Sequence, residues 1–124
     1  MRINEEFRRR TKKYASSIIR LYASLPHTRR EVEVLGHQLL RSGTSVAAHI
    51  RESSRARSDA EFCSKCEVAL QEADESHLWL ELLKEDCGIN GPDIEGLLRE
   101  THELVAILVT IISKTRGRDK KLKL

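Results

Sequence analysis

The sequence contains few of the residues that interrupt or cross-link a chain. Its 124 residues include two prolines, six glycines and three cysteines, and aromatic residues make up 4% of the total. So few turn formers and aromatic residues argue against a sheet protein, and an odd number of cysteines argues against a disulfide framework. Hydrophobic residues at 40% and charged residues at 33% then favour a single all-α domain with its own core.

Long apolar segments are also absent. The most apolar stretch, residues 104–112, is nine residues long and includes Thr110, so it is too short to span a bilayer. The first residues do not resemble a signal peptide. We therefore expect a cytoplasmic protein that makes no contact with a membrane.

Four segments repeat apolar residues at the spacing of amphipathic helices: residues 5–24, 29–55, 59–86 and 92–114. Thr28 and Ser58 each begin a capping box, and Pro92 suits the first position of the fourth helix. Short connections predict an antiparallel up-down-up-down four-helix bundle over residues 1–115. A basic, flexible tail is expected over residues 116–124.

The fourth segment is apolar nearly all round from Leu104 to Ile112. A four-helix bundle buries one stripe of each helix, so this surplus of apolar surface implies a partner. Self-association is the simplest source of one.

Two of the cysteines, Cys63 and Cys66, have the C-x-x-C spacing of metal and redox sites. They lie inside a helical pattern, and no second pair completes a zinc site. Cys66 falls on the apolar seam expected for the third helix, which favours a small buried side chain over metal binding or redox chemistry. That seam contains Phe62, Cys66, Ala69, Ala73, His77, Leu80 and Leu83.

Polar residues also recur at helical spacing beside the apolar seam of the second helix. We name this set the polar seam; it consists of Gln38, Arg41, Ser45, His49 and Glu52, with Glu72 and Glu75 from the third helix. We expect a buried structural network in which Arg41 binds a carboxylate of the third helix and fixes the helix register. The alternative is a catalytic site in which His49 and a carboxylate act as acid and base.

Metal or cofactor chemistry has little support in the sequence. Glu72, Glu75 and His77 resemble the Glu-x-x-His motif of di-metal bundles in composition. Their spacing differs, because no glutamate lies three residues before a histidine on a core face. With no motif for a nucleophile or cofactor either, the prediction is a protein that is not an enzyme and has no metal or cofactor.

The net charge of +3 is unevenly distributed along the chain. Residues 1–13 hold six basic and two acidic groups, residues 116–124 hold five and one, and residues 58–86 hold two and nine. One explanation is a dipolar bundle whose acidic helix faces basic helices across subunits. The other is a surface that binds nucleic acid through its phosphates, because the one aromatic residue of these basic segments, Phe7, falls on an apolar stripe and leaves none for base stacking. Its candidate residues are Arg8, Arg9, Lys12, Lys13, Arg51, Arg55, Arg57, Arg116, Arg118, Lys120 and Lys121.

The second and third helices resemble a known family. The pattern Q-L-x-R-A-x-x-S-I-x-A-N-I-x-E-G is matched by Gln38, Leu39, Arg41, Ser45, Val46, Ala48, Ile50 and Glu52. His49 stands where the family has Asn, and Ser53 where it has Gly. An E-F pair and an A-x-x-E-x-x-E segment follow as Glu61, Phe62, Ala69, Glu72 and Glu75. Over about residues 5–113 the chain resembles bacterial four-helix-bundle proteins first noticed in intervening sequences of 23S rRNA genes.

The resemblance implies an all-α homo-oligomer, typically a five-membered ring, and no enzymatic activity. Relatives include accessory proteins of diversity-generating retroelements, which resemble basic pentamers that bind reverse transcriptase and nucleic acid. The expected function is therefore a non-enzymatic assembly or adaptor protein that contacts RNA, DNA or a nucleic-acid enzyme such as a reverse transcriptase. The alternative is a scaffold that binds only proteins.

Overall fold

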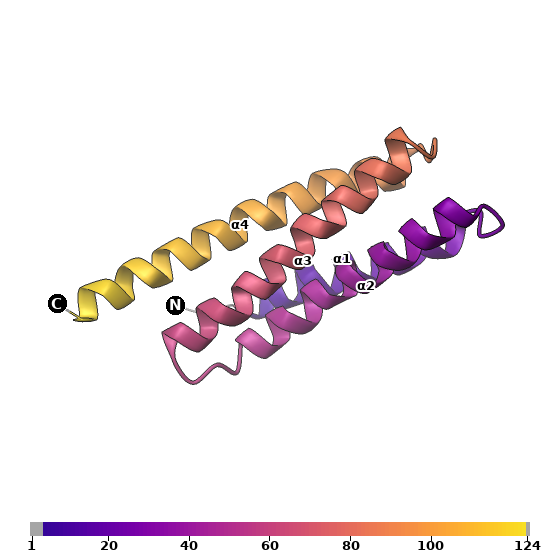
Figure 1. Cartoon of the computed structure of the whole chain (residues 1–124). Helices are drawn as coiled ribbons and strands as arrows, with labels where there is room; N and C mark the ends of the chain where they lie inside the picture. Colours follow the sequence, from indigo (N-terminus) through magenta and orange to yellow (C-terminus); the bar gives the residue numbers. More distant parts are fainter. Residues whose placement is uncertain (1–3, 124) are drawn as a thin grey trace.

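Four long helices make up the part of the chain that the structure describes. The computed structural model describes the backbone of residues 4–123 and the side chains of residues 4–117. The helices are α1 (Glu5–Ser24), α2 (Arg30–Ser53), α3 (Asp59–Glu85) and α4 (Pro92–Lys123). Consecutive helices run in opposite directions (Figure 1), which confirms the predicted antiparallel bundle. None of these helices has a stretch long and apolar enough to cross a membrane.

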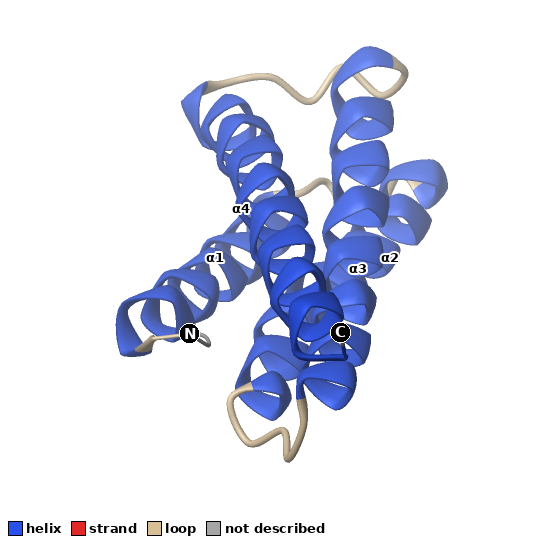
Figure 2. Cartoon of the chain, turned by 90° about the vertical axis from the view of Figure 1, so that its left-hand side faces the viewer, coloured by secondary structure: helices blue, strands red, loops and turns tan. Residues whose placement is uncertain are grey.

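The helices do not pack equally on one another. α2 packs most extensively on α3, followed by α3 on α4 and α1 on α2, whereas α1 touches α4 least. Figure 2 shows α1 leaning away from the other helices. Among the described residues α1 and α3 make no close backbone contact, so they occupy opposite corners of the bundle.

The helix starts follow their capping residues, with one exception. The side chain of Ser58 accepts a hydrogen bond from the Glu61 amide at 3.1 Å and begins α3 as predicted. The predicted cap at Thr28 is wrong: the N-cap residue of α2 is Arg29, and its side chain makes no capping hydrogen bond. Contacts across the preceding turn hold this end instead: Tyr22 Oη donates to Glu33 at 2.6 Å, and His27 also contacts Glu33.

The C-terminal end of α4 also differs from the prediction. A tail was expected from residue 116, but α4 continues to Lys123 and projects past the start of α3 (Figure 1). Thr115 is buried, its hydroxyl donates to the Ile111 carbonyl one turn earlier in α4 at 2.9 Å, and Arg116 forms an ion pair with Glu67. The ion pair attaches α4 to α3 beyond residue 114, the predicted end of the helix.

The core lies between the four apolar stripes. All three cysteines are buried and none forms a disulfide with another described residue, and burial raises the pKa of the Cys66 thiol to about 11. On α3 the buried seam contains Ser76, whereas His77 is half-buried, so the predicted seam was displaced by one residue there. The largest fully buried apolar side chains are Ile18, Val32, Leu39, Val46, Ile50, Phe62, Leu80, Leu83, Ile94, Leu104 and Leu108.

Gly43 lets α1 and α2 approach each other closely. A Cβ atom at this position would lie 2.8 Å from Ile18 Cγ1 and 3.0 Å from Ile18 Cγ2. Both atoms are near the backbone of a stiff β-branched side chain. α2 has a glycine in its middle because Ile18 of α1 occupies the space that a side chain at position 43 would need.

Candidate functional site

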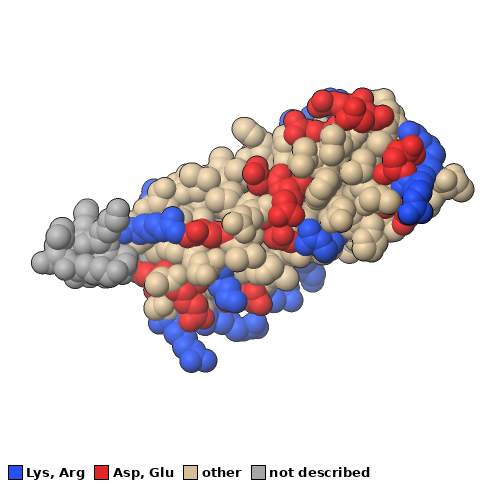
Figure 3. Space-filling view, in the orientation of Figure 1, with Lys and Arg blue, Asp and Glu red and all other residues tan. Residues whose placement is uncertain are grey.

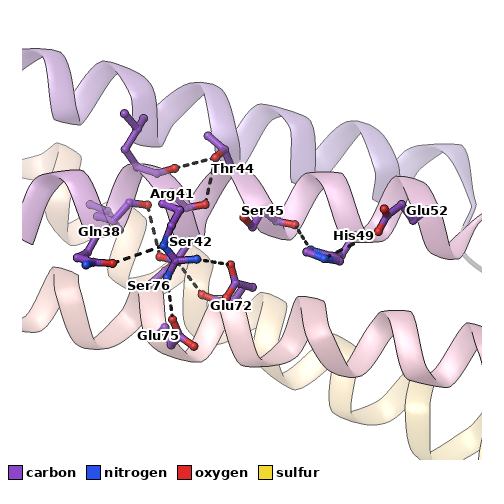
Figure 4. Close-up of polar contacts among 12 residues, drawn as sticks. Gln38, Arg41, Ser42, Thr44, Ser45, His49, Glu52, Glu72, Glu75 and Ser76 are labelled. Carbon is purple, nitrogen blue, oxygen red and sulfur yellow. Dashed lines mark hydrogen bonds and ion pairs between the residues drawn. The ribbon is translucent and has the colours of Figure 1, made fainter.

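The polar seam connects α2 to α3 through Arg41 (Figure 4). Its guanidinium lies 3.2 Å from a carboxylate oxygen of Glu72 and 3.2 Å from one of Glu75, and its Nε lies 3.5 Å from the Gln38 side-chain oxygen. Glu72 and Glu75 are one helical turn apart, so the two terminal nitrogens of one guanidinium reach both of them. The predicted contact between Arg41 and a carboxylate of the third helix is present.

The remaining polar-seam residues form a separate group one to two turns further along α2. His49 Nδ1 lies 2.8 Å from the Ser45 carbonyl oxygen, and His49 Nε2 lies 3.8 Å from the Glu52 carboxylate. Glu52 also lies 3.8 Å from the ammonium group of Lys65 on α3. Figure 4 shows this group apart from the one around Arg41, so the structure divides the expected single network into two.

The polar seam is more exposed than the sequence predicted. The side chain of Arg41 is 50% exposed and that of Glu75 is 44% exposed, whereas Glu72 is 13% exposed. The network lies on the surface because α2 and α3 border only its inner side. Exposed ion pairs contribute about 0–1 kcal/mol, so these contacts set the relative position of two helices more than they stabilise the fold.

The two departures from the family pattern each have a structural explanation. Ser53 is fully buried, and its hydroxyl donates to the Ile50 carbonyl at 2.7 Å and bonds to the Cys66 thiol. His49 bonds to the Ser45 carbonyl one turn before it. Both side chains are therefore satisfied within α2 and its neighbour.

A buried layer of hydroxyl groups, which the sequence did not predict, joins all four helices. We name it the hydroxyl layer; it consists of Tyr14, Ser42, Ser76 and Thr101. Tyr14 Oη lies 2.6 Å from Thr101 Oγ1, Ser42 Oγ lies 2.7 Å from Ser76 Oγ, and Ser76 is a neighbour of Tyr14. Burial raises the pKa of Tyr14 to about 12. The sequence did contain a signal for this layer: Ser42, Ser76 and Thr101 each interrupt the apolar stripe of a different helix.

Five of the predicted basic residues meet at one end of the bundle. They line a groove of about 340 Å³ between the start of α1 and the end of α2, together with Glu5. Glu5 lies 4.0 Å from Arg8, and the other four cations form no ion pair with any described residue. We name this the basic groove; its cations are Arg8, Arg9, Lys12, Arg51 and Arg55. Figure 3 shows Lys and Arg side chains gathered at the lower left, where α2 leads into α3.

The other predicted basic residues do not line this groove. Lys13 borders a second groove, between α1 and α4, and Arg57 is exposed in the connection after α2. Arg116 is neutralised by Glu67. The side chains of Arg118, Lys120 and Lys121 lie outside the described residues.

Arg10, in contrast to the cations of the basic groove, is bound by carboxylates of α4. Its guanidinium donates to both carboxylate oxygens of Glu100 at 2.8 and 2.7 Å and to Glu103 at 3.2 Å. The hydrogen bonds to Glu100 raise the pKa of Arg10. The cations of the basic groove lack such bidentate partners among the described residues, so their charge remains available to a ligand.

The described side chains offer no grouped ligands for a metal ion. No three of the described His, Cys, Asp and Glu residues lie close enough together to hold one. His49 and the carboxylates of the polar seam are engaged with each other and with basic groups. What the arrangement can do is bind anions at the basic groove.

Comparison with known proteins agrees with this architecture. Residues 4–110 match the model of the 23S rRNA-intervening sequence protein family. The chain is also similar to a crystal structure of a protein with unknown function from the S23 ribosomal protein family of Bacteroides thetaiotaomicron. The two are 36% identical with a TM-score of 0.77, and the match covers 85% of this chain and 96% of the other. No curated protein matches the chain.

Proposed function

Because the chain belongs to the 23S rRNA-intervening sequence protein family, we propose that it is a non-enzymatic, homo-oligomeric assembly or adaptor protein. In this proposal it works in the cytoplasm and contacts RNA, DNA or a nucleic-acid enzyme such as a reverse transcriptase. Each subunit contributes a phosphate-binding surface, and the oligomer repeats that surface. Weak contacts repeated on one assembly then give a useful combined affinity.

The basic groove is the observation that carries the proposal. Arg9, Lys12, Arg51 and Arg55 come from two helix ends and surround one groove without an ion pair to any described residue. Like charges held together repel one another, and a bound polyanion removes that repulsion. Backbone phosphates are the ligand that fits, because neutralising them releases counterions and needs no base contact.

The groove also indicates how nucleic acid would be bound. None of its lining residues is aromatic, so bases have no surface on which to stack. Guanidinium groups bind phosphate oxygens through paired N–H donors. The proposed binding therefore follows the phosphate backbone and tolerates changes of sequence.

Self-association has separate support from exposed apolar side chains. Ile19, Val34, Leu78 and Val109 are between 45% and 50% exposed in one chain. These side chains lie one on each helix, and covering such apolar surface with another protein is favourable. A second copy of the chain is the simplest partner, and a pentamer is the assembly that the family resemblance suggests.

The test is nucleic-acid binding measured by gel shift across a salt series. Labelled duplex RNA and duplex DNA are titrated with the wild type and with Arg51→Gln/Arg55→Gln. We expect weaker binding of both probes and a salt dependence whose log–log slope is smaller by about two, since each phosphate contact contributes about 0.9. Arg30→Gln/Arg99→Gln is the matched control, because both arginines are exposed outside the basic groove.

Two results would reject the nucleic-acid role. One is a wild type that retards neither probe at low salt, and the other is equal loss of binding in the control variant. A wild type that assembles but binds no nucleic acid supports the second candidate, a scaffold that binds only proteins. The exposed aliphatic side chains favour that candidate, and pull-down with and without nuclease distinguishes the two.

A further inference from the structure

The surfaces of α1 and α3 carry opposite charge. From Phe7 to Ser24, α1 contains six basic residues and no acidic one, whereas α3 and its flanking residues 58–86 contain nine acidic and two basic residues. The two helices occupy opposite corners of the bundle. They therefore cannot neutralise each other within one chain.

Each of these helices also exposes one large aliphatic side chain among its charges. Ile19 on α1 is 50% exposed, and Leu78 on α3 is 45% exposed. Lys13 and Arg20 are exposed two turns apart on α1 and border its groove with α4, about a third of a turn around the helix from Ile19, whereas Asp74 and Glu85 lie on the same stripe of α3 as Leu78. The exposed side of α1 thus carries basic charges beside one aliphatic side chain, and the α3 stripe carries acidic charges around one.

The four flanking charges are not used inside the chain. Lys13, Arg20, Asp74 and Glu85 are exposed, and none of them forms an ion pair with a described residue. Two carboxylates border the α1 surface from α4, of which Glu100 is already bound by Arg10. Only Asp93 remains near Lys13 and Arg20 to compete with an incoming acidic surface.

We propose that the α1 surface around Ile19 binds the α3 surface around Leu78 of a second copy of this chain. The occupant is a second copy because the chain itself carries both complementary surfaces, on opposite corners. Such an interface is heterologous: every subunit donates one surface and receives the other, so subunits add head to tail. The inference rests on the proposed homo-oligomer and specifies which faces meet. The basic groove takes Arg8, Arg9 and Lys12 from α1, nearer its start than Ile19 and Arg20, and Arg51 and Arg55 from the end of α2.

Charge reversal on one surface at a time tests the interface by sedimentation velocity. We compare Lys13→Glu/Arg20→Glu, Asp74→Lys/Glu85→Lys, the chain that carries all four substitutions and the wild type, each checked for helix content by circular dichroism. Each double variant should weaken assembly by about tenfold or more, because like charges then face each other. The fourfold variant should assemble again, since every interface then pairs an acidic α1 surface with a basic α3 surface. Arg30→Glu/Arg99→Glu, the matched control, should assemble like the wild type.

The outcomes separate this interface from the rest of the proposed function. Folded double variants that assemble as well as the wild type, or a fourfold variant that does not recover, overturn the α1–α3 interface while leaving homo-oligomer formation intact. A monomeric wild type overturns both, and the gel-shift result still decides the nucleic-acid role on its own. Leu78→Ala provides a second measurement without any charge change, and it should weaken assembly.

Discussion

The phenolic oxygen of Tyr14 lies 2.6 Å from the hydroxyl oxygen of Thr101, inside the bundle and between the two adjacent helices that touch least. The Thr101 hydroxyl donates to the Leu97 carbonyl at 2.6 Å, so Tyr14 is the donor toward Thr101. Both residues are almost completely buried. A hydrogen bond in this dry environment positions α1 against α4 where apolar packing is sparse.

Removal of the Tyr14 hydroxyl should destabilise the bundle. We expect Tyr14→Phe to lower the free energy of unfolding by about 1–3 kcal/mol, because Thr101 loses a buried hydrogen-bond donor. Urea unfolding measures the change. A double-mutant cycle with Thr101→Val should give a coupling energy of about 0.5 kcal/mol or more, and additive effects of the two substitutions would contradict the proposed contact.

The same residue predicts a loss of stability in alkaline solution. Burial raises the pKa of Tyr14 from 10.0 to about 12, so the unfolded chain loses this proton first. Its contribution is complete below pH 10 and disappears as the pH rises toward 12, which amounts to roughly 2–3 kcal/mol. Urea unfolding at a series of pH values should show a steeper decline for the wild type than for Tyr14→Phe. Cys66, whose pKa is raised to about 11 by burial, acts in the same direction in both proteins, so parallel curves would refute the assignment to Tyr14.

Gly43 should resist substitution although helices favour alanine. Gly43→Ala places a Cβ atom 2.8 Å from Ile18 Cγ1, and overpacking costs about 1–3 kcal/mol. This exceeds the gain of about 1 kcal/mol in helix propensity, so we expect net destabilisation in thermal and urea unfolding. Gly96→Ala is the control and should stabilise, since the nearest atom to its Cβ is the flexible Arg99 guanidinium at 3.9 Å. In an Ile18→Ala background the cost of Gly43→Ala should vanish.

The ion pairs of Arg41 should matter little for stability. Glu72→Gln removes one carboxylate from a guanidinium whose side chain is 50% exposed. We expect a loss of at most about 1 kcal/mol, with the variant folded and helical by circular dichroism. Added salt should shrink the difference from the wild type, because screening weakens exposed pairs. A variant that fails to fold would show that Glu72 supports the core in a way its surface contacts do not explain.

The contacts between buried polar residues could not be predicted, because helical spacing shows which face of a helix is buried but not which residues of another helix pack against it. The apolar stripe through Ile18 could be read from its spacing, but the partners of Ser42 could not. Ser42 and Ser76 meet only because α2 and α3 pack in one particular register, and that register depends on contacts along both helices. The same holds for the basic groove, whose cations come from two separate segments of the sequence, residues 8–12 and 51–55.

The sequence by itself determined the four helices, their antiparallel order, the buried cysteines and the opposite charges of α1 and α3. These properties follow from residue spacing and composition within single segments, which local periodicity records. The tertiary structure decided which polar groups are buried and which basic residues share a groove. It placed the polar seam at the surface and a hydroxyl layer in the core, because burial depends on the rotation of each helix about its own axis. It also extended α4 to Lys123, beyond the predicted end, and joined Arg116 to Glu67 of α3 in an ion pair that the local sequence does not contain.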